Sequence, residues 1–387
     1  MKTKYNFYFL ILIMTALAFA LVSGCEGPIG PPGKDGVDGI DGIDGNDGTP
    51  GVAGNVTCLA CHTGANILDK QNEFHQSVHH AGQIAVDYAG GRSSCARCHS
   101  SEGFIEFAET GDVAENIATP SAWECKTCHS IHETFEGVDY ALRLKDPIEF
   151  IYDNSVVVDF GTSNLCANCH QTRRPSPVNQ GGTMIDLDKD KDTGTDGKEF
   201  TIPEGSFYIS STHYGPHYGS QSNLLYGVGF AEMAGTESYP EAGSGGHMAE
   251  DAKCTGCHMS DYGNGQGGHT FNPALDACTE CHPGASSFDI NGSQTAIETQ
   301  LNELRDLLVT AGVIEQESEL TYEINQETGL IEAITEPGGY HPVVGVYTKE
   351  EAEAFFNWDG MVEDRSLGVH NPKYAKALLT NSIEALQ

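Results

Sequence analysis

The chain has little positive charge. Its 20 Lys and Arg stand against 55 Asp and Glu, so its formal net charge at neutral pH is -35. Such a surface repels nucleic acid and anionic lipid headgroups, and it favours basic partners or metal cations. Nucleic acid is therefore excluded as a partner.

Apolar sequence is scarce as well. Hydrophobic residues make up 39% of the 387 residues, and the one long apolar run lies near the start, from Tyr5 to Val22. The chain beyond this run is expected to be soluble. Its own side chains would form only a small core, so something else must help to fill the interior.

No cysteine is left over for a structural disulfide. Of the 13 Cys, 12 form six pairs in which two residues separate the cysteines and a His follows directly. Two thiols about one helical turn apart can add to the two vinyl groups of one porphyrin, and the adjoining His can supply an axial nitrogen to iron. The expected haem-attaching residues are Cys58, Cys61, Cys95, Cys98, Cys125, Cys128, Cys166, Cys169, Cys254, Cys257, Cys278 and Cys281. The expected proximal ligands are His62, His99, His129, His170, His258 and His282.

Cysteine pairs can also mark disulfides or zinc sites. Only 16 of the 387 residues are His, so a His after each of six pairs does not arise by chance. We interpret the motifs as attachment sites for six covalent haem c groups. The porphyrin faces would supply the missing apolar core, and the chain without haem is expected not to fold.

The N-terminus has the pattern of an export signal. Lys2 and Lys4 precede the apolar run, which ends at small residues just before Cys25. This pattern is typical of a secretory signal, here residues 1–24, and it predicts that Cys25 carries the lipid of a bacterial lipoprotein. A plain signal peptide and an uncleaved anchor helix are the alternatives. Glu26, where an Asp can mark inner-membrane retention, favours the outer membrane.

Residues 25–54 form a low-complexity spacer. Gly recurs at every third position from Gly27 to Gly54, which is the repeat that a collagen triple helix requires. Pro is scarce after Pro32, and Asp fills many of the third positions. Two interpretations remain open. A collagen-like stalk would make the protein a homotrimer or a higher assembly, whereas a flexible acidic tether would leave it a monomer.

Each iron needs a second axial ligand or keeps an open position, and ten His lie outside the motifs. Residues 73–80 are expected to be helical, which places His75 and His79 on one face, and we select His79 as the ligand. His132 lies three residues after a motif His, which suits ligation of a neighbouring haem. His213 and His217 flank a Gly-Pro pair in a predicted turn.

The remaining candidates lie beside special backbone residues. His247 and His269 each follow two glycines, which let the backbone approach a flat ring closely. His370 precedes Asn371-Pro372, an N-cap followed by Pro at the first helical position, so a helix start would hold this ligand in place. His341 is interpreted as structural. The expected distal ligands are His79, His132, His213, His217, His247, His269 and His370.

Several of these segments resemble the multihaem cytochromes related to cytochrome c nitrite reductase and the octahaem hydroxylamine oxidoreductase group. The similar phrases are the second motif with Ser101 to Phe104, the third with His132, the fourth with Arg173, His217 to Gln221, His258-Met259, Gly-Gly-His269 and Gly368 to Ala375. The resemblance spans about residues 55–282 plus the C-terminal helices. It implies that His132, His217, His247, His269 and His370 are distal ligands.

The chain departs from that family at the catalytic centre. Nitrite reductases of this type carry a Cys-x-x-Cys-Lys haem, and no such motif occurs here. The tyrosine context of hydroxylamine oxidation is absent from the sequence too. The resemblance therefore implies the arrangement of haems and axial ligands for electron transfer, and it does not imply the catalytic activity of that family.

An acidic loop lies in the longest gap between motifs. Counted from Asp188 as the first position, acidic residues fall where a calcium loop has its ligands, at Asp188, Asp190, Asp192, Asp196 and Glu199. Thr193 stands where such a loop requires Gly. A calcium site and a solvated acidic loop are both open interpretations.

The sequence beyond the last motif predicts helices. Apolar residues from Ile297 to Leu308 recur at helical spacing, which predicts an amphipathic helix over about 293–311. A hairpin around Gly329 follows, and then two helices over 349–358 and 372–386.

The expected fold is mainly α and loop-rich, a multihaem cytochrome c fold with C-terminal helices. Residues 55–290 would wrap around six covalent haems, and residues 291–387 would pack on that domain.

Bis-His ligation closes both axial positions and gives lower reduction potentials than His/Met ligation. We therefore expect an electron carrier in a periplasmic or cell-surface respiratory chain, with redox proteins as donor and acceptor and a lipid anchor in the membrane. One alternative is a haem-based reductase of nitrite, hydroxylamine or a sulfur oxyanion with one open iron. Arg173, Arg174, His213 and His217 would then line the distal space. Another alternative is a surface haem assembly or filament.

Overall fold

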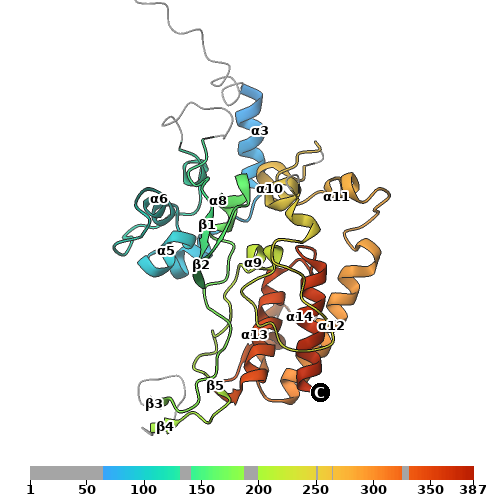
Figure 1. Cartoon of the computed structure of the whole chain (residues 1–387). Helices are drawn as coiled ribbons and strands as arrows, with labels where there is room; N and C mark the ends of the chain where they lie inside the picture. Colours follow the sequence, from blue (N-terminus) through green and yellow to red (C-terminus); the bar gives the residue numbers. More distant parts are fainter. Residues whose placement is uncertain (1–63, 131–140, 187–198, 250–251, 264, 325–330) are drawn as a thin grey trace, which may run out of the picture. The chain divides into compact units, whose positions relative to one another are not determined.

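The computed structural model describes residues 64–130, 141–186, 199–249, 252–263, 265–324 and 331–387, without the side chains of 319–337 (Figure 1). The chain divides into two units, residues 1–53 and 54–387, and every described residue belongs to the second. Several predictions lie outside the described residues: the signal peptide, Cys25, the Gly-rich spacer, Cys58, Cys61, His62, His132, Asp188, Asp190, Asp192 and Asp196.

The architecture is mainly helical and loop-rich, with helices at the C-terminus (Figure 1). Five Cys-x-x-Cys-His motifs lie on or against short helices, since one helical turn brings the two cysteines to the same side. These helices are α5 (Ser93–His99), α7 (Cys125–Cys128), α8 (Asn164–Ala167), α10 (Lys253–His258) and α11 (Leu275–Cys281).

Other short helices connect the motifs. They are α3 (Gly64–His75), α4 (Gln83–Ala85), a π-helix (Val86–Gly90), α6 (Ser101–Thr110), α9 (Gln221–Tyr226) and short 3-10 helices at Gly161–Ser163, Gly246–Met248, Gly268–Thr270 and Ile290–Gly292. Two small antiparallel sheets pair β1 (Ile148–Phe150) with β2 (Asp153–Val158), and β3 (Met184–Asp186) with β4 (Glu199–Thr201).

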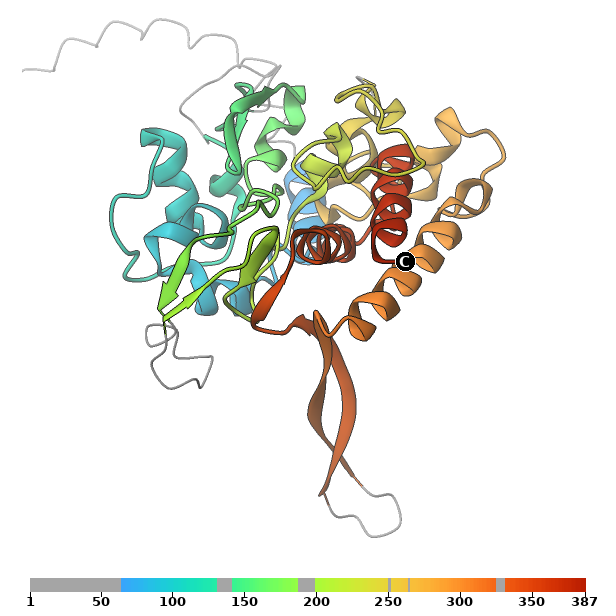
Figure 2. The ribbon, with the colours of Figure 1, turned by 60° about the horizontal axis from the view of Figure 1, so that its bottom comes forward.

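The C-terminal elements follow the sequence prediction. They are α12 (Ser293–Thr310), α13 (Lys349–Asp364) and α14 (Pro372–Leu386), and α13 continues six residues beyond its predicted end. The predicted hairpin is present as β6 (Ile314–Ile324) and β7 (Ile331–Pro342), which Figure 2 shows as one twisted ribbon. Strand β8 (Gly345–Thr348) pairs antiparallel with β5 (Ser206–Ile209) and so joins the tail to the middle of the chain.

The main hydrophobic core forms around the three C-terminal helices. Ile297, Leu301, Leu304 and Leu308 point inward from α12, as their spacing predicts, and pack with residues of α13, α14, β5 and α9. A smaller cluster joins β1 and β2 to Ala167 of α8 and Leu225 of α9. Most of the apolar packing in the described chain therefore lies beside the motif helices rather than among them.

One predicted helix ends early. Residues 73–80 were expected to be helical throughout, but α3 stops at His75 and a turn follows. The Ser77 hydroxyl donates to the Phe74 carbonyl and accepts from the His80 amide, which replaces the helical pattern with turn hydrogen bonds. His75 and His79 therefore do not share a helix face.

Among the described residues, no helix is both long and apolar enough to cross a membrane.

Candidate haem sites

Each of the five described motif histidines faces a second histidine from a distant part of the chain. The ring centroids are 5.9 Å apart for His99–His217, 6.2 Å for His129–His269, 6.1 Å for His170–His79, 6.3 Å for His258–His370 and 6.4 Å for His282–His247. We call these the second-, third-, fourth-, fifth- and sixth-motif sites. Their shared separation is the central geometric fact of the structure.

This separation matches two imidazoles on opposite sides of one metal ion. A metal–imidazole bond is about 2.0 Å and the ring nitrogen lies about 1.1 Å from the ring centre, so the centroids would be roughly 6.2 Å apart. Rotation of either ring about the line through the metal leaves that spacing unchanged, which accounts for interplanar angles from 27° to 81°. His75 and His80, whose centroids are 4.5 Å apart, are too close to hold a metal between them.

Hydrogen bonds fix the orientation of several of these rings. Nδ1 of His258 donates to the Phe271 carbonyl at 2.7 Å, and Nδ1 of His247 donates to the Val369 carbonyl at 2.6 Å. Nδ1 of His170 lies 3.1 Å from the Gln221 side-chain oxygen. A proton held on Nδ1 leaves Nε2 unprotonated and pointing away from the hydrogen-bond acceptor. This is the tautomer that binds a metal.

Burial keeps most of these imidazoles neutral. Burial lowers the pKa of His79 to about 4, and charge repulsion from His170 adds to the shift. Burial likewise lowers the pKa of His217 to about 4, and charge repulsion from Arg173 adds to that shift. Burial also lowers the pKa values of four further histidines of these pairs, His99, His170, His258 and His269. Neutral imidazole is the metal-binding form, so at neutral pH these side chains are ready to act as ligands.

His370 is the exception. Its Nδ1 lies 2.5 Å from Oδ1 of Asp364, whose side chain is fully buried. Burial opposes a charge on His370, but attraction to Asp364 and the hydrogen bond to it together prevail and raise the pKa of His370. The predicted helix start is present beside it, since the Asn371 side chain accepts from the Tyr374 amide at the first turn of α14.

The motifs adjoin one another through their cysteines. Cys98 of the second motif lies close to Cys169 of the fourth, and Cys166 of the fourth lies close to Cys254 of the fifth. Cys128 of the third motif lies close enough to both fourth-motif cysteines to raise the pKa values of their thiols, and Cys257 is similarly placed near Cys278 and Cys281. The fourth motif is thus a junction between the second, third and fifth, and the fifth leads to the sixth.

The donor set fits haem c. The ten described motif cysteines are all unpaired, and no cluster of three or more His, Cys, Asp or Glu side chains converges among the described residues. Two histidines in line and two free thiols beside one of them are what a covalently bound, six-coordinate haem needs.

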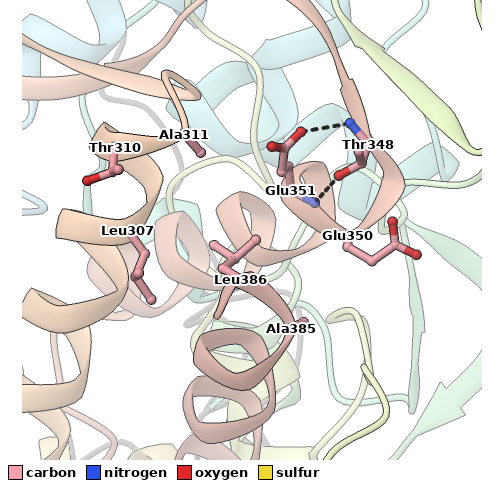
Figure 3. A pocket seen from close by; sticks show the side chains of 8 residues that line it. All are labelled: Leu307, Thr310, Ala311, Thr348, Glu350, Glu351, Ala385 and Leu386. Atoms are coloured by element: carbon pink, nitrogen blue, oxygen red, sulfur yellow. Dashed lines mark hydrogen bonds between the residues drawn. The ribbon is translucent and has the colours of Figure 1, made fainter.

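The structure also places the other predicted residues. His213 lies in a small pocket with Arg173, Arg174, Gly215 and His217, but it is not a member of any of the five histidine pairs described above. Glu199 is exposed at the start of β4. A larger cavity of about 270 Å³ lies among α12, β8, α13 and α14, near Leu307 and Leu386 and away from the motifs (Figure 3).

Sequence reasoning missed the residues that support the rings. Asp364, Gln221 and Glu73 are polar side chains with no motif of their own, and Glu73 Oε2 lies 3.7 Å from Nδ1 of His269. The amide of His269 also donates to Glu73, at 2.9 Å. Gly268 has a φ of 53°, and a side chain there would meet the Glu73 carboxylate. The absence of a side chain at Gly268 therefore lets the backbone at His269 approach the Glu73 carboxylate. A glycine directly before a candidate ligand was the sequence feature that could have indicated such a neighbour.

Comparison with protein-family models gives no match, and comparison with curated proteins gives none. The fold is similar to a solved structure titled "Crystal Structure of Outer Cell Wall Cytochrome OcwA", with a TM-score of 0.46 and 16% sequence identity. The match covers 82% of this chain and 50% of that chain, so this chain spans about half of its length.

Proposed function

We propose that the protein is a multihaem electron-transfer cytochrome. The observation that carries the proposal is that each described motif histidine faces a second histidine at 5.9 to 6.4 Å. Such pairs close both axial positions of a haem iron, so these five sites offer no iron position to a substrate. Bound haem would supply one-electron oxidation and reduction.

The polypeptide's part is to hold neighbouring sites close together. The neighbouring cysteines of the second, fourth and fifth motifs support a continuous row of sites, with the third joined at the fourth and the sixth at the fifth. Burial of the histidines limits water around them, and hydrogen bonds to Nδ1 keep the rings from turning. Rigid, closely spaced sites suit rapid electron transfer without chemistry on a substrate.

The finer parts of the proposal rest on the sequence. Six motifs support six haem c groups, and the N-terminal pattern supports export and a lipid on Cys25, with the outer membrane favoured. Donor and acceptor would be redox proteins of a periplasmic or cell-surface respiratory chain. The glycine repeat supports a trimeric stalk, and the acidic residues from Asp188 to Glu199 support a calcium loop.

A reductase is the second candidate, because a basic pocket lies at one site. Arg173, Arg174 and His213 line a cavity of about 100 Å³ that also touches His217. His217 has a φ of 77°, a conformation that non-glycine residues rarely adopt and that is found at functional positions. This candidate requires His217 to leave the axial position so that an oxyanion can reach the iron.

Low-temperature electron paramagnetic resonance of the oxidised, purified protein separates the two. The electron carrier predicts that all haems are low-spin, before and after addition of nitrite or sulfite. A high-spin haem that shifts when the anion is added would reject the carrier and support the reductase. The Arg173→Gln variant is the matched control for anion binding, because it removes a charge from the pocket and leaves both axial histidines in place.

A further inference from the structure

Two of the five described sites have opposite electrostatic surroundings. The second-motif site, His99–His217, lies among arginines. The fifth-motif site, His258–His370, has a buried carboxylate hydrogen-bonded to one of its rings. The chain has only 20 Lys and Arg against 55 Asp and Glu, so a concentration of positive charge at one site is unusual in it.

Four of the seven arginines in the sequence gather at the second-motif site. Arg92 and Arg173 are close enough to His99 to lower its pKa, and Arg173 and Arg174 act on His217 in the same way. Arg97 belongs to the motif itself, and its guanidinium donates at 3.3 Å to the carbonyl of Asn168, which lies within the fourth motif. The guanidinium of Arg173 lies 3.4 Å from the Ser94 carbonyl, which anchors it at the start of the motif helix.

These arginines contact groups that carry no formal negative charge. Their partners are backbone carbonyls and aromatic faces: Arg92 lies over Tyr88, Arg97 over Phe107 and Arg174 over Tyr214. None of the four forms an ion pair with a carboxylate in the part of the chain that the structure describes. By contrast, Arg143 and Arg305 are each paired with an acidic side chain.

The fifth-motif site has the reverse arrangement. Asp364 is fully buried, and its Oδ1 lies 2.5 Å from Nδ1 of His370. Ser366 binds the other carboxylate oxygen through its hydroxyl and its amide, which fixes the carboxylate in place. A carboxylate on the far nitrogen makes an imidazole a stronger donor to its metal, and a negative charge in a poorly solvated place acts over a longer range than one at the surface.

These surroundings set the order of the reduction potentials. Reduction adds an electron, so nearby positive charge favours the reduced form and nearby negative charge favours the oxidised form. The second-motif site should have the higher potential and the fifth-motif site the lower. The fourth-motif site joins them, because Cys98 touches Cys169 and Cys166 touches Cys254.

We propose that the array is polarised, so that electrons run from the fifth-motif site through the fourth-motif site to the second-motif site, where they leave. The direction is set by Asp364 at one end and by Arg92, Arg97, Arg173 and Arg174 at the other. One electron leaves one site and enters the next, so no bond is made or broken and no proton is needed. The inference rests on the proposed electron-transfer function and adds a direction to it.

The test is a potentiometric titration of the holoprotein, followed by electron paramagnetic resonance so that individual haems are resolved. Arg173→Gln should lower one potential, and Asp364→Asn, which keeps an oxygen for His370, should raise a different one. We expect the Asp364→Asn shift to correspond to about a tenfold change in the reduction equilibrium, about 59 mV for one electron. The Arg173→Gln shift should be smaller, because Arg173 is exposed and water screens its charge. The control is Arg305→Gln on α12, which should leave every potential unchanged.

The outcomes are distinguishable from failure of the proposed function. If all haems stay low-spin but neither variant moves a potential, or both move the same one, the direction is wrong and the carrier stands. A shift of opposite sign in either variant also overturns the direction. If the unmodified protein already has a high-spin haem, the carrier itself is rejected. Arg173 is exposed, so its variant is expected to fold even if Asp364→Asn does not.

Discussion

The region of the motifs and the region of the C-terminal helices bury different kinds of side chain. Of the 18 buried polar or charged residues described, 13 lie before residue 290, among them Ser100, Asn164 and Asn223. In α12 to α14 the buried faces are mostly apolar, with Leu304, Phe355 and Leu378 fully enclosed. The C-terminal region can be held together by its own apolar side chains, whereas we expect the motif region to depend on the apolar faces of the proposed haems.

The two regions are nevertheless joined at defined points. Strand β5 pairs with β8, and Ser220 donates to the Gly360 carbonyl of α13. His370 and Asp364 reach a haem site from the ends of α14 and α13. The C-terminal helices thus form a rigid support that positions His370 and Asp364 beside the motif region.

The largest expected effect comes from withholding haem. A full-length chain produced without haem attachment should lose amide protection in α5, α7, α8 and α10, because those short helices have little apolar packing of their own. Helices α12 to α14 should retain much of theirs, because they share an apolar core, so the structure limits the unfolding expected without haem to the motif region. Hydrogen exchange followed by mass spectrometry measures both regions in one sample. Equal protection with and without haem would show that the comparison is wrong.

A cavity in the C-terminal core should have a large effect on stability and little on the haem sites. Leu304 on α12 is fully buried, so Leu304→Ala should lower the free energy of unfolding by about 3 kcal/mol. Val309 on the same helix is 43% exposed, and Val309→Ala serves as the matched control. Chemical denaturation followed by far-ultraviolet circular dichroism measures the change. A visible haem spectrum altered by Leu304→Ala alone would indicate tighter coupling between the regions than we infer.

The smallest effect expected is at the start of α13. The Thr348 hydroxyl accepts from the Glu351 amide, and the Glu351 carboxylate accepts from the Thr348 amide, a capping box that Figure 3 shows. Thr348→Ala should cost about 1 kcal/mol of unfolding free energy, whereas Thr348→Ser should cost little. Thermal unfolding of the two variants gives the difference. Equal losses would indicate that the methyl group, rather than the cap, contributes to stability.

Local patterns in the sequence predicted local structure well. The four apolar residues of α12 recur at helical spacing, and Asn371-Pro372 begins α14 as an N-cap pair should. The end of α3 at His75 was missed, because Ser77 forms turn hydrogen bonds that no periodicity reveals. Strands β1 and β2 were missed as well.

The pairing of histidines could not be read from the sequence. His79 and His170 are 91 positions apart, and His129 and His269 are 140 apart, so no local rule relates them. The residues alone favoured His79 and both His213 and His217 as ligands, and only the family resemblance singled out His217 over His213. The structure brings His217 to His99 and leaves His213 in the pocket beside Arg174. Asp364 and Gln221 act only through the tertiary positions of the rings they contact.

The central claim is that the facing histidines are axial partners of one iron. It is tested most directly by comparing His79→Ala with His75→Ala, two substitutions four residues apart, one in the turn that follows α3 and one at the last residue of α3. His79 faces the motif ring of His170, whereas His75 contacts His80. Electron paramagnetic resonance of the oxidised holoproteins should show one haem changing from low-spin to high-spin in His79→Ala and no change in His75→Ala. An unchanged spectrum in His79→Ala, or the same change in both variants, would contradict the account.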